Sequence, residues 1–275
     1  MSSPSPEARL LVLALIALLL AGPAAATPGE LRVCADPDNL PFSNARGEGF
    51  ENRVAEVLAR ELGLALRYTW WAQRRGFVRQ TLGTGTCDVL LGVPEGFERA
   101  RLTRPYYAST YVFAWRRGDG PAVRSLDDPA LRRVRVGVQL IGNDGTNTPP
   151  AHALARRGIV DNVRGYTVYG SSTTAEPPGR ILTALAAGEI DVALVWGPLA
   201  GYFAPRQAVA IELAPVTPAL DPPGLRFVFA IAAGVRKDDT ALGERLDAAL
   251  AARRAEIDAI LDAYGVPRAR AADVR

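Results

Sequence analysis

Two segments of this chain repeat each other at a constant offset of 103 residues. The stretch RGFVRQTLGTGTCDVLLG, which begins at Arg75, aligns with PGRILTALAAGEIDVALV, which begins at Pro178. The same offset places the LRV of residues 31–33 on the VRV of residues 134–136. One offset for two separate segments indicates two similar α/β units. The alternative is that both halves only share the general pattern of helices and strands.

Strands alternate with helices through the first half of the chain. Gly63 and Gly83 follow the two helical patterns, at positions where helices favour glycine. A β-α-β-α-β order implies a parallel sheet with helices on its faces. The hydrophobic periodicity predicts strands at 31–35, 64–71 and 88–93 and helices at 51–62 and 74–82.

Two β-rich runs, 106–115 and 225–232, are predicted to connect the units. If both are crossovers, the second unit is inserted into the first, and the C-terminal helical pattern returns to cover the first. The sequence thus predicts an α/β protein with two lobes, two hinge crossovers and a cleft between the lobes. The predicted division is a signal peptide at 1–26, lobe 1 at 27–112 plus 230–275, and lobe 2 at 113–229.

The first residues are typical of a secretory signal peptide. Arg9 precedes an apolar run at 10–21 that is too short to span a bilayer, and small residues follow at 24–26. Cleavage after Ala26 leaves 275 − 26 = 249 residues. We therefore expect a periplasmic protein with no membrane segment after cleavage; a retained membrane anchor is the alternative.

The charge distribution argues against nucleic-acid binding. The net charge is +3, spread through mixed-sign segments without a block of five like charges. Cys34 and Cys87 are the only cysteines, and in an exported protein such a pair predicts a disulfide. A bridge over 87 − 34 = 53 positions would stabilise the fold by about 4 kcal/mol. Two buried free thiols are the alternative, and no metal site is expected.

Several blocks in order resemble one known family. ADPDNLPFS, GFENRVAEVLARELG, TRPYYASTYVF and VGVQ are similar to the periplasmic type II solute-binding proteins of ABC transporters. CADPDNLPFSN, YTWWAQRRGF, CDVLLGVPEGF and VGVQLIGNDGTNTPPAHALARRGI more narrowly resemble the MoxJ/XoxJ-type proteins encoded beside quinoprotein methanol dehydrogenases.

The resemblance implies a non-catalytic accessory protein of methanol oxidation. Its implied partner is a dehydrogenase for methanol or another alcohol that depends on pyrroloquinoline quinone (PQQ), with the associated cytochrome c as a further candidate. The resemblance implies no cofactor for the chain itself. The alternative is the substrate-binding subunit of an ABC transporter with a small organic ligand in the cleft. An enzyme on this fold is the third possibility.

The residues argue against an ordinary amino-acid receptor. Receptors of this fold pair the ligand ammonium with an acid in lobe 2, because an unpaired buried charge costs several kcal/mol. The matching residue here is Trp196. The positions that stack on the ligand side chain fall on Asn39 and Arg75, and neither Arg99 nor Arg101 is a safe match for the carboxylate-binding arginine.

Aromatic and arginine side chains replace those groups, and both types are enriched at protein-interface hot spots. Alternative roles remain for each. Alternation would bury one of Trp70 and Trp71, the pair Arg74-Arg75 could be a solvated helix start, and Trp196 could fill the cleft wall. We predict a ligand- or partner-binding cleft formed by Asp36, Asn39, Phe42, Trp70, Trp71, Arg74, Arg75, Glu95, Asn143, Asp144, Thr146 and Trp196.

Two polar features carry weaker signals. The segment IGNDGTNTPP (141–150) lies where this fold places an anion-cradling turn, although a simple turn with an N-cap at Thr148 explains it as well. Its single carboxylate, Asp144, argues against a calcium or lanthanide loop. Glu95, Glu48 and Glu51 are the carboxylates near the expected cleft, and nothing pairs them into an acid/base couple.

Overall fold

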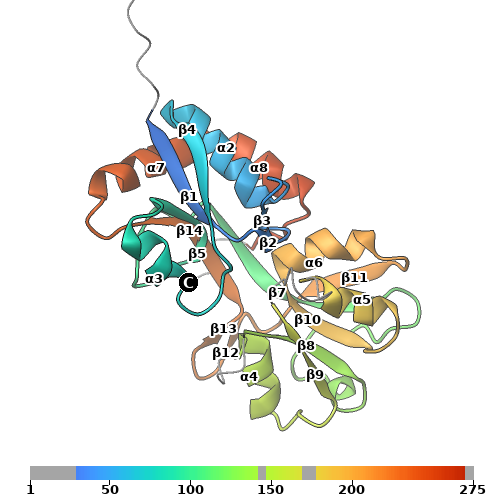
Figure 1. The fold of residues 1–275 in the computed structure, drawn as a ribbon. Helices are drawn as coiled ribbons and strands as arrows, with labels where there is room; N and C mark the ends of the chain where they lie inside the picture. Colours follow the sequence, from blue (N-terminus) through green and yellow to red (C-terminus); the bar gives the residue numbers. More distant parts are fainter. Residues whose placement is uncertain (1–28, 142–146, 169–177, 270–275) are drawn as a thin grey trace, which may run out of the picture.

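The computed structural model describes residues 29–141, 147–168 and 178–269. The predicted signal peptide therefore lies outside the described residues and stays a prediction. The chain forms two α/β lobes that share one continuous ten-stranded sheet (Figure 1). Across the sheet the strand order is β4-β1-β5-β14-β7-β10-β8-β9, with β6 beside β14 and β11 beside β7.

Lobe 1 is built on three parallel strands, β1 (Glu30–Ala35), β4 (Ala65–Trp70) and β5 (Val89–Pro94). One face packs against helices that come from distant parts of the sequence, and the other face packs against a short helical segment. The remaining elements of this lobe are β2 (Asp38–Asn39), β3 (Ser43–Asn44), α2 (Phe50–Leu62), α3 (Phe77–Gln80), η1 (Leu82–Thr84), β6 (Arg101–Leu102), α7 (Thr240–Ala252) and α8 (Arg254–Ala263).

Lobe 2 repeats this plan. Its parallel strands are β8 (Val136–Leu140), β9 (Val163–Thr167) and β10 (Val192–Trp196). Helices pack on both faces of these strands, over two separate apolar clusters. The remaining elements are η2 (Pro129–Arg132), α4 (Pro149–Arg156), α5 (Arg180–Ala186), α6 (Gly197–Phe203), η3 (Ala204–Arg206), β11 (Ile211–Pro215), β12 (Leu220–Asp221) and β13 (Leu225–Arg226).

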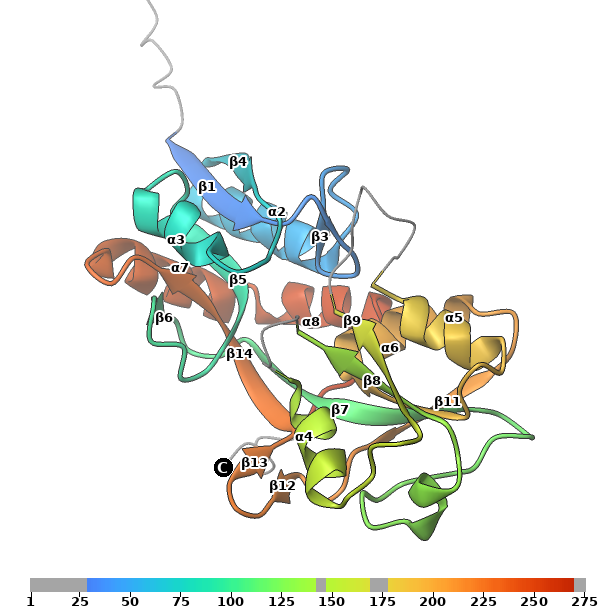
Figure 2. The same ribbon diagram turned by 60° about the horizontal axis from the view of Figure 1, so that its bottom comes forward.

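Two long antiparallel strands, β7 (Tyr107–Arg116) and β14 (Val228–Val235), connect the lobes. β7 pairs with β14 in its first half and with β10 in its second half, so it runs from one lobe into the other (Figures 1 and 2). β14 returns and pairs with β5. Both β-rich runs are thus strands that join the lobes, as the sequence predicts. The proposed boundaries at 112/113 and 229/230 lie inside these strands and remain a prediction.

The internal repeat is visible as two equivalent ion pairs. In lobe 1, Arg32 on β1 donates two hydrogen bonds to the carboxylate of Asp88, at 2.8 and 2.6 Å. In lobe 2, Arg135 donates to both carboxylate oxygens of Asp191, at 3.0 and 2.6 Å. Both pairs are related by the offset of 103 residues that the sequence displays (135 − 32 and 191 − 88).

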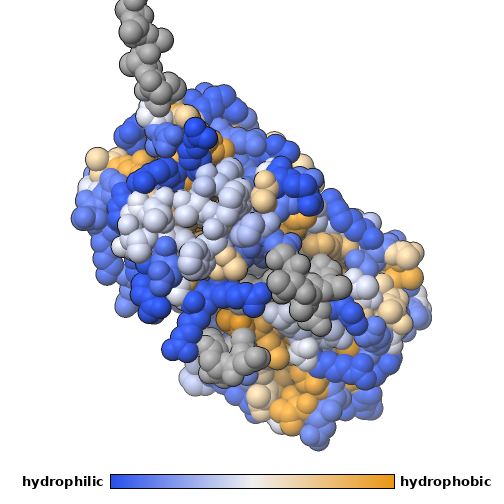
Figure 3. All heavy atoms as spheres, in the orientation of Figure 1, coloured by the Kyte–Doolittle hydropathy of each residue, from blue (hydrophilic) through white to orange (hydrophobic). Residues whose placement is uncertain are grey.

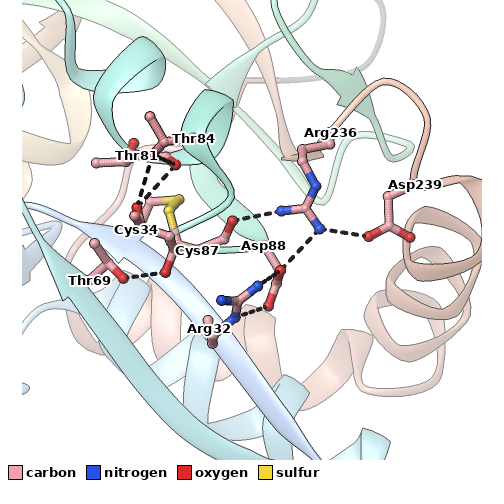
Figure 4. A network of polar contacts seen from close by, with 10 residues as sticks. Arg32, Cys34, Thr69, Thr81, Thr84, Cys87, Asp88, Arg236 and Asp239 are labelled. Atoms are coloured by element: carbon pink, nitrogen blue, oxygen red, sulfur yellow. Dashed lines mark hydrogen bonds and ion pairs between the residues drawn. A yellow bond between two sulfur atoms is a disulfide. The ribbon is translucent and has the colours of Figure 1, made fainter.

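A second arginine joins each pair from a connecting strand. Figure 4 shows the cluster of lobe 1. Arg236, which follows β14, lies 3.1 Å from Asp88 and donates to the carbonyl of Cys87. Arg116, at the end of β7, lies 3.9 Å from Asp191 and donates to the carbonyl of Ile190. Each connecting strand is therefore fastened to the lobe that it enters.

The predicted disulfide is confirmed. Cys34 on β1 and Cys87 are bridged, with their Cα atoms 5.4 Å apart. The bridge lies between the ion pair of Asp88 and a group of threonine hydrogen bonds at the start of β5 (Figure 4). It joins the two neighbouring strands β1 and β5 beneath α3.

One predicted helix is shorter than expected. The sequence pattern predicts a helix at 74–82, whereas α3 begins only at Phe77 and ends at Gln80. Gly76 adopts a φ of 93°, which a right-handed helix does not allow, and residues 71–76 form a loop instead. This difference places Arg74 and Arg75 on a loop at the edge of the lobe.

The lobes also touch on the side of α6. A Cβ atom on Gly201 of α6 would lie 1.8 Å from the carbonyl oxygen of Gly265, so the two backbones approach without an intervening side chain. The rings of Tyr202 and Tyr264 stack next to this contact, 5.7 Å apart. None of the helices in the described ranges has the length and apolar content needed to span a membrane.

Candidate functional site

The loop after β1 is held in place by Asp36. This side chain is buried, and its two carboxylate oxygens accept hydrogen bonds from the backbone N–H groups of Asp38 and Gln73, at 2.8 and 2.6 Å. Asn39 then donates from its side-chain amide to the side chain of Gln73, at 2.9 Å. Asp36 therefore organises the loop, and Asn39 and Gln73 are the residues that reach the space between the lobes.

A cavity of about 400 Å³ lies between the lobes, within the size range of small-molecule sites. Its described lining contains neutral polar groups from Asn39, Gln73, Gln139 and Thr148. The aromatic lining residues are Phe42, Tyr107, Tyr111, Trp196 and Phe229. The remaining lining residues are Gly92, Pro94, Ile141, Pro149, Val168, Leu199 and Ile231. Among these described residues there is no charged side chain.

Trp196 forms one wall of this cavity at the carboxyl end of β10. Its ring meets Tyr111 and Phe229 edge-on, with centroids 5.2 and 5.9 Å apart. Tyr111 and Phe229 belong to the two connecting strands. The Trp196 ring is thus packed against both connecting strands.

The backbone around Trp196 is held by a buried glutamine. The Trp196 N–H donates to the side-chain oxygen of Gln139 at 2.7 Å, and the Thr148 hydroxyl donates to the Gln139 carbonyl at 2.6 Å. Gln139 is 1% exposed. Thr148 is the N-cap residue of α4 as predicted, yet its hydroxyl joins α4 to β8 and does not cap the helix.

The adjacent tryptophans at the end of β4 differ in exposure, as the sequence predicts. Trp70 stacks on Tyr68 at 4.5 Å and packs against the lobe 1 core, whereas Trp71 is 47% exposed. Trp71, Arg74 and Arg75 lie on the loop 71–76, which we call the rim loop. Figure 3 shows a strongly hydrophilic band at the place of this loop, extending toward lobe 2. These residues lie outside the described cavity lining.

The remaining predicted site residues that the structure describes do not line the cavity. Glu95 is exposed beyond β5, next to the lining residue Pro94. Asn143, Asp144 and Thr146 lie outside the described residues, so their proposed anion-binding role stays a prediction. Of the predicted cleft residues, Asn39, Phe42 and Trp196 line the cavity directly.

Glu51 is an unusual carboxyl next to the cavity. It lies in the first turn of α2. Its Oε1 is so close to Gly92 that a Cβ atom added to this glycine would lie only 2.1 Å away from it. Gly92 has a φ of 70° and lines the cavity. Burial raises the pKa of Glu51 to about 8. Within the described residues its carboxyl makes no hydrogen bond or ion pair, so it is mainly protonated at neutral pH.

Sequence reasoning did not identify two tyrosines of β7, Tyr107 and Tyr111. Both line the cavity, and burial raises the pKa of each phenol well above its usual range. Tyr107 is 4% exposed. Neither hydroxyl makes a hydrogen bond within the described ranges. Alternation along the run YYASTYVFAW could have placed both on one face of the strand, because they are four residues apart.

Comparison with known proteins assigns the chain to a family. The profile of the bacterial extracellular solute-binding proteins, family 3, matches residues 31–267. The MoxJ protein of Methylorubrum extorquens is 33% identical over 87% of this chain and 81% of its own length. The MoxJ protein of Paracoccus denitrificans is 29% identical over 91% of this chain and 93% of its own length. This chain is a MoxJ-type member of family 3.

Solved structures agree with this assignment. The periplasmic binding protein XoxJ of Methylobacterium extorquens AM1 superimposes on the MoxJ-type chain with a TM-score of 0.72, at 35% identity, over 87% of this chain and 99% of its own. An amino-acid transporter substrate-binding protein of Streptococcus pneumoniae, bound to L-arginine, has a TM-score of 0.61 at 22% identity, over 86% of this chain and 94% of its own. The second likeness shows only that the fold is shared. The MoxJ-type chain thus keeps the binding-protein fold, with a cavity whose described lining is uncharged and rich in aromatic residues.

Proposed function

We propose that this protein is a non-catalytic periplasmic accessory factor of methanol oxidation. In this role it binds a PQQ-dependent methanol or alcohol dehydrogenase and supports the maturation or activation of that enzyme. The names of its relatives, MoxJ and XoxJ, support the association with methanol oxidation. The partner role rests on the chemistry of the cleft.

The observation that carries the proposal is the neutral lining of the cavity. A zwitterionic amino acid would bring two charges into a space whose described lining offers no opposite charge, at a cost of several kcal/mol for each. In addition, Trp196 is the residue that matches the ammonium-binding acid of amino-acid receptors with this fold, and its ring packs against Tyr111. The fold is therefore retained without the chemistry of an amino-acid receptor, and this favours a protein partner over nutrient uptake.

We infer that the rim loop takes part in binding the dehydrogenase. Trp71 exposes a large ring beside Arg75, which is also exposed and makes no ion pair within the described residues. Exposed tryptophan and arginine side chains are the types that most often become hot spots when a partner covers them. Asp36 fixes the base of this loop through the Gln73 N–H, so its position does not depend on the partner.

The test is a binding measurement with the purified quinoprotein dehydrogenase of the same organism. We expect the intact protein to bind, and Trp71→Ala and Arg75→Ala each to weaken binding about tenfold or more. Arg133→Ala is the matched control, because Arg133 is equally exposed but lies on lobe 2. A second readout compares the specific activity of dehydrogenase produced with and without the accessory protein.

Uptake of a solute is the competing function, since the cavity has the size of a small-molecule site. It predicts micromolar affinity for a free metabolite and binding to a permease complex, with no affinity for the dehydrogenase. Failure of the intact protein to bind the dehydrogenase or to affect its activity would refute the accessory role.

A further inference from the structure

The cavity between the lobes contains two hydroxyl groups without a protein partner. Tyr107 and Tyr111 both line it, and within the described residues neither phenol makes a hydrogen bond. Tyr107 is 4% exposed as a residue, and Tyr111 is half-buried. A ligand that accepts hydrogen bonds in the cavity would satisfy both groups.

The remaining lining residues favour a ligand whose main part is apolar. Trp196, Tyr111 and Phe229 form a triangle of rings that meet at angles of 60–75°, with centroid separations of 5.2–6.4 Å. Leu199 and Ile231 add aliphatic surface to the same space. Rings in such arrangements bind other rings by offset stacking or edge-on contact. The lining therefore favours a flat or compact apolar group.

The described lining also offers no charged partner to a ligand. Its polar members are amides and hydroxyls, namely those of Asn39, Gln73, Gln139 and Thr148 besides the two phenols. The amide of Asn39 is already bonded to Gln73, and that of Gln139 accepts from the Trp196 N–H. Glu51, beside Gly92, is protonated at neutral pH and adds no charge to this region.

We propose that the cavity binds an uncharged small molecule with an aromatic or alicyclic body and at least one oxygen that accepts a hydrogen bond from Tyr107 or Tyr111. Neutral aromatic ketones, alcohols and esters belong to this class. The inference does not depend on the proposed partner role, because the rim loop residues Trp71 and Arg75 lie outside the cavity lining.

The experiment is calorimetric titration of the full mature protein with three probes of similar size. Acetophenone is neutral and carries an acceptor, ethylbenzene is neutral and lacks one, and benzoate is charged. We expect acetophenone to bind about fivefold or more tightly than ethylbenzene, as one additional hydrogen bond implies, and benzoate not to bind.

Variants assign the effect to the two phenols. Tyr107→Phe and Tyr111→Phe remove the hydroxyl and keep the ring, so each should reduce the preference for acetophenone over ethylbenzene and leave the affinity for ethylbenzene unchanged. Trp196→Ala should weaken both neutral probes, and Trp71→Ala should weaken neither. Each variant is first checked for a wild-type circular dichroism spectrum.

Three outcomes would overturn the proposal. They are equal or tighter binding of benzoate, a preference for acetophenone that survives both Phe variants, and no binding of either neutral probe at millimolar concentration by the folded protein. The result is independent of the dehydrogenase test. A protein that binds acetophenone but not the dehydrogenase would refute the accessory role alone, and the converse would refute the ligand proposal alone.

Discussion

Glu51 shows how one buried side chain can make the stability of this protein depend on pH. Its carboxyl is desolvated against Gly92 and has no charged partner within the described chain, so its pKa rises from 4.5 to about 8. It also raises the pKa values of Tyr106 and Tyr107 further. The unfolded chain ionises this carboxyl near its ordinary value, whereas the folded protein keeps it protonated.

We predict that Glu51→Gln stabilises the protein in a pH-dependent manner. Because the folded pKa is raised, the wild type loses stability as the pH increases from about 4.5 to 8, and the loss is complete above the folded value. The free energy of unfolding of Glu51→Gln should match that of the wild type near pH 4.5. Near pH 8 it should exceed the wild-type value by about 2–4 kcal/mol.

Urea titrations across this pH range measure the difference. Glu48→Gln is the control of opposite sign, since hydrogen bonds from Arg46 and Asn44 lower the pKa of Glu48. A difference between Glu51→Gln and the wild type that stays constant with pH would show that the carboxyl is solvated.

At the scale of elements, the two arginine–aspartate clusters fasten each connecting strand to a lobe. Although burial opposes it, hydrogen bonds from Arg32 and Arg236 hold the pKa of Asp88 below its usual range. Hydrogen bonds from Arg135 lower the pKa of Asp191 in the same way. The two aspartates therefore anchor the connecting strands in the same way in the two lobes.

We predict that Asp88→Asn and Asp191→Asn each lower the free energy of unfolding by about 1–3 kcal/mol. The change at Asp88 removes charge-assisted hydrogen bonds from Arg32 and Arg236, and the change at Asp191 removes those from Arg135. The aspartate side chains are only 13% and 20% exposed. The difference in free energy of unfolding between wild type and variant should shrink as the pH falls through the lowered pKa of the wild-type carboxyl.

Denaturant unfolding measures the stability of both variants. Glu56→Gln, which breaks an exposed pair with Arg53, should cost about 0.5 kcal/mol or less. Variants of Asp88 and Asp191 no worse than this control would contradict the anchoring role.

The offset of 103 residues aligns half of each cluster and leaves the other half unaligned, and the ion pairs themselves were not predicted. Arg32 and Asp88 repeat at that offset because they lie in or directly before equivalent parallel strands. Arg116 and Arg236 are 120 residues apart (236 − 116), because they come from the two antiparallel connecting strands. Their equivalence follows from the spatial symmetry of the lobes and has no counterpart in a linear alignment.

The candidate site shows the same division between local pattern and tertiary packing. Trp196 could be placed at the cleft because it follows a buried strand whose carboxyl end faces the other lobe. Trp70 and Trp71 differ in exposure, as the sequence predicts. Residues 74–76 of the rim loop were expected to be helical, but the positive φ of Gly76 prevents a helix there. Tyr107, Tyr111 and Phe229 became lining residues only through the pairing of β7 with β14.

At the scale of the whole molecule, the contact between α6 and the segment after α8 limits how the lobes can move. Gly201 and Gly265 bring the two backbones together, and the Ser109 hydroxyl donates to the Pro267 carbonyl at 2.6 Å nearby. α6 starts directly after Trp196 and contributes Leu199 to the cavity. A change at this contact should therefore be transmitted to the cavity wall.

We predict that Gly201→Val forces the lobes apart on the side of α6 and alters the cavity. The new side chain would have to occupy the position of the Gly265 carbonyl, so α6 must shift, at a cost of about 1–3 kcal/mol in stability. Small-angle X-ray scattering should show a changed radius of gyration, and the fluorescence of Trp196 should change with it. Ala208→Val, at an exposed position beyond η3, is the control and should leave both signals unchanged. A folded Gly201→Val protein with wild-type scattering and fluorescence would mean that the contact with α6 does not determine the arrangement of the lobes, and the two connecting strands would then set it alone.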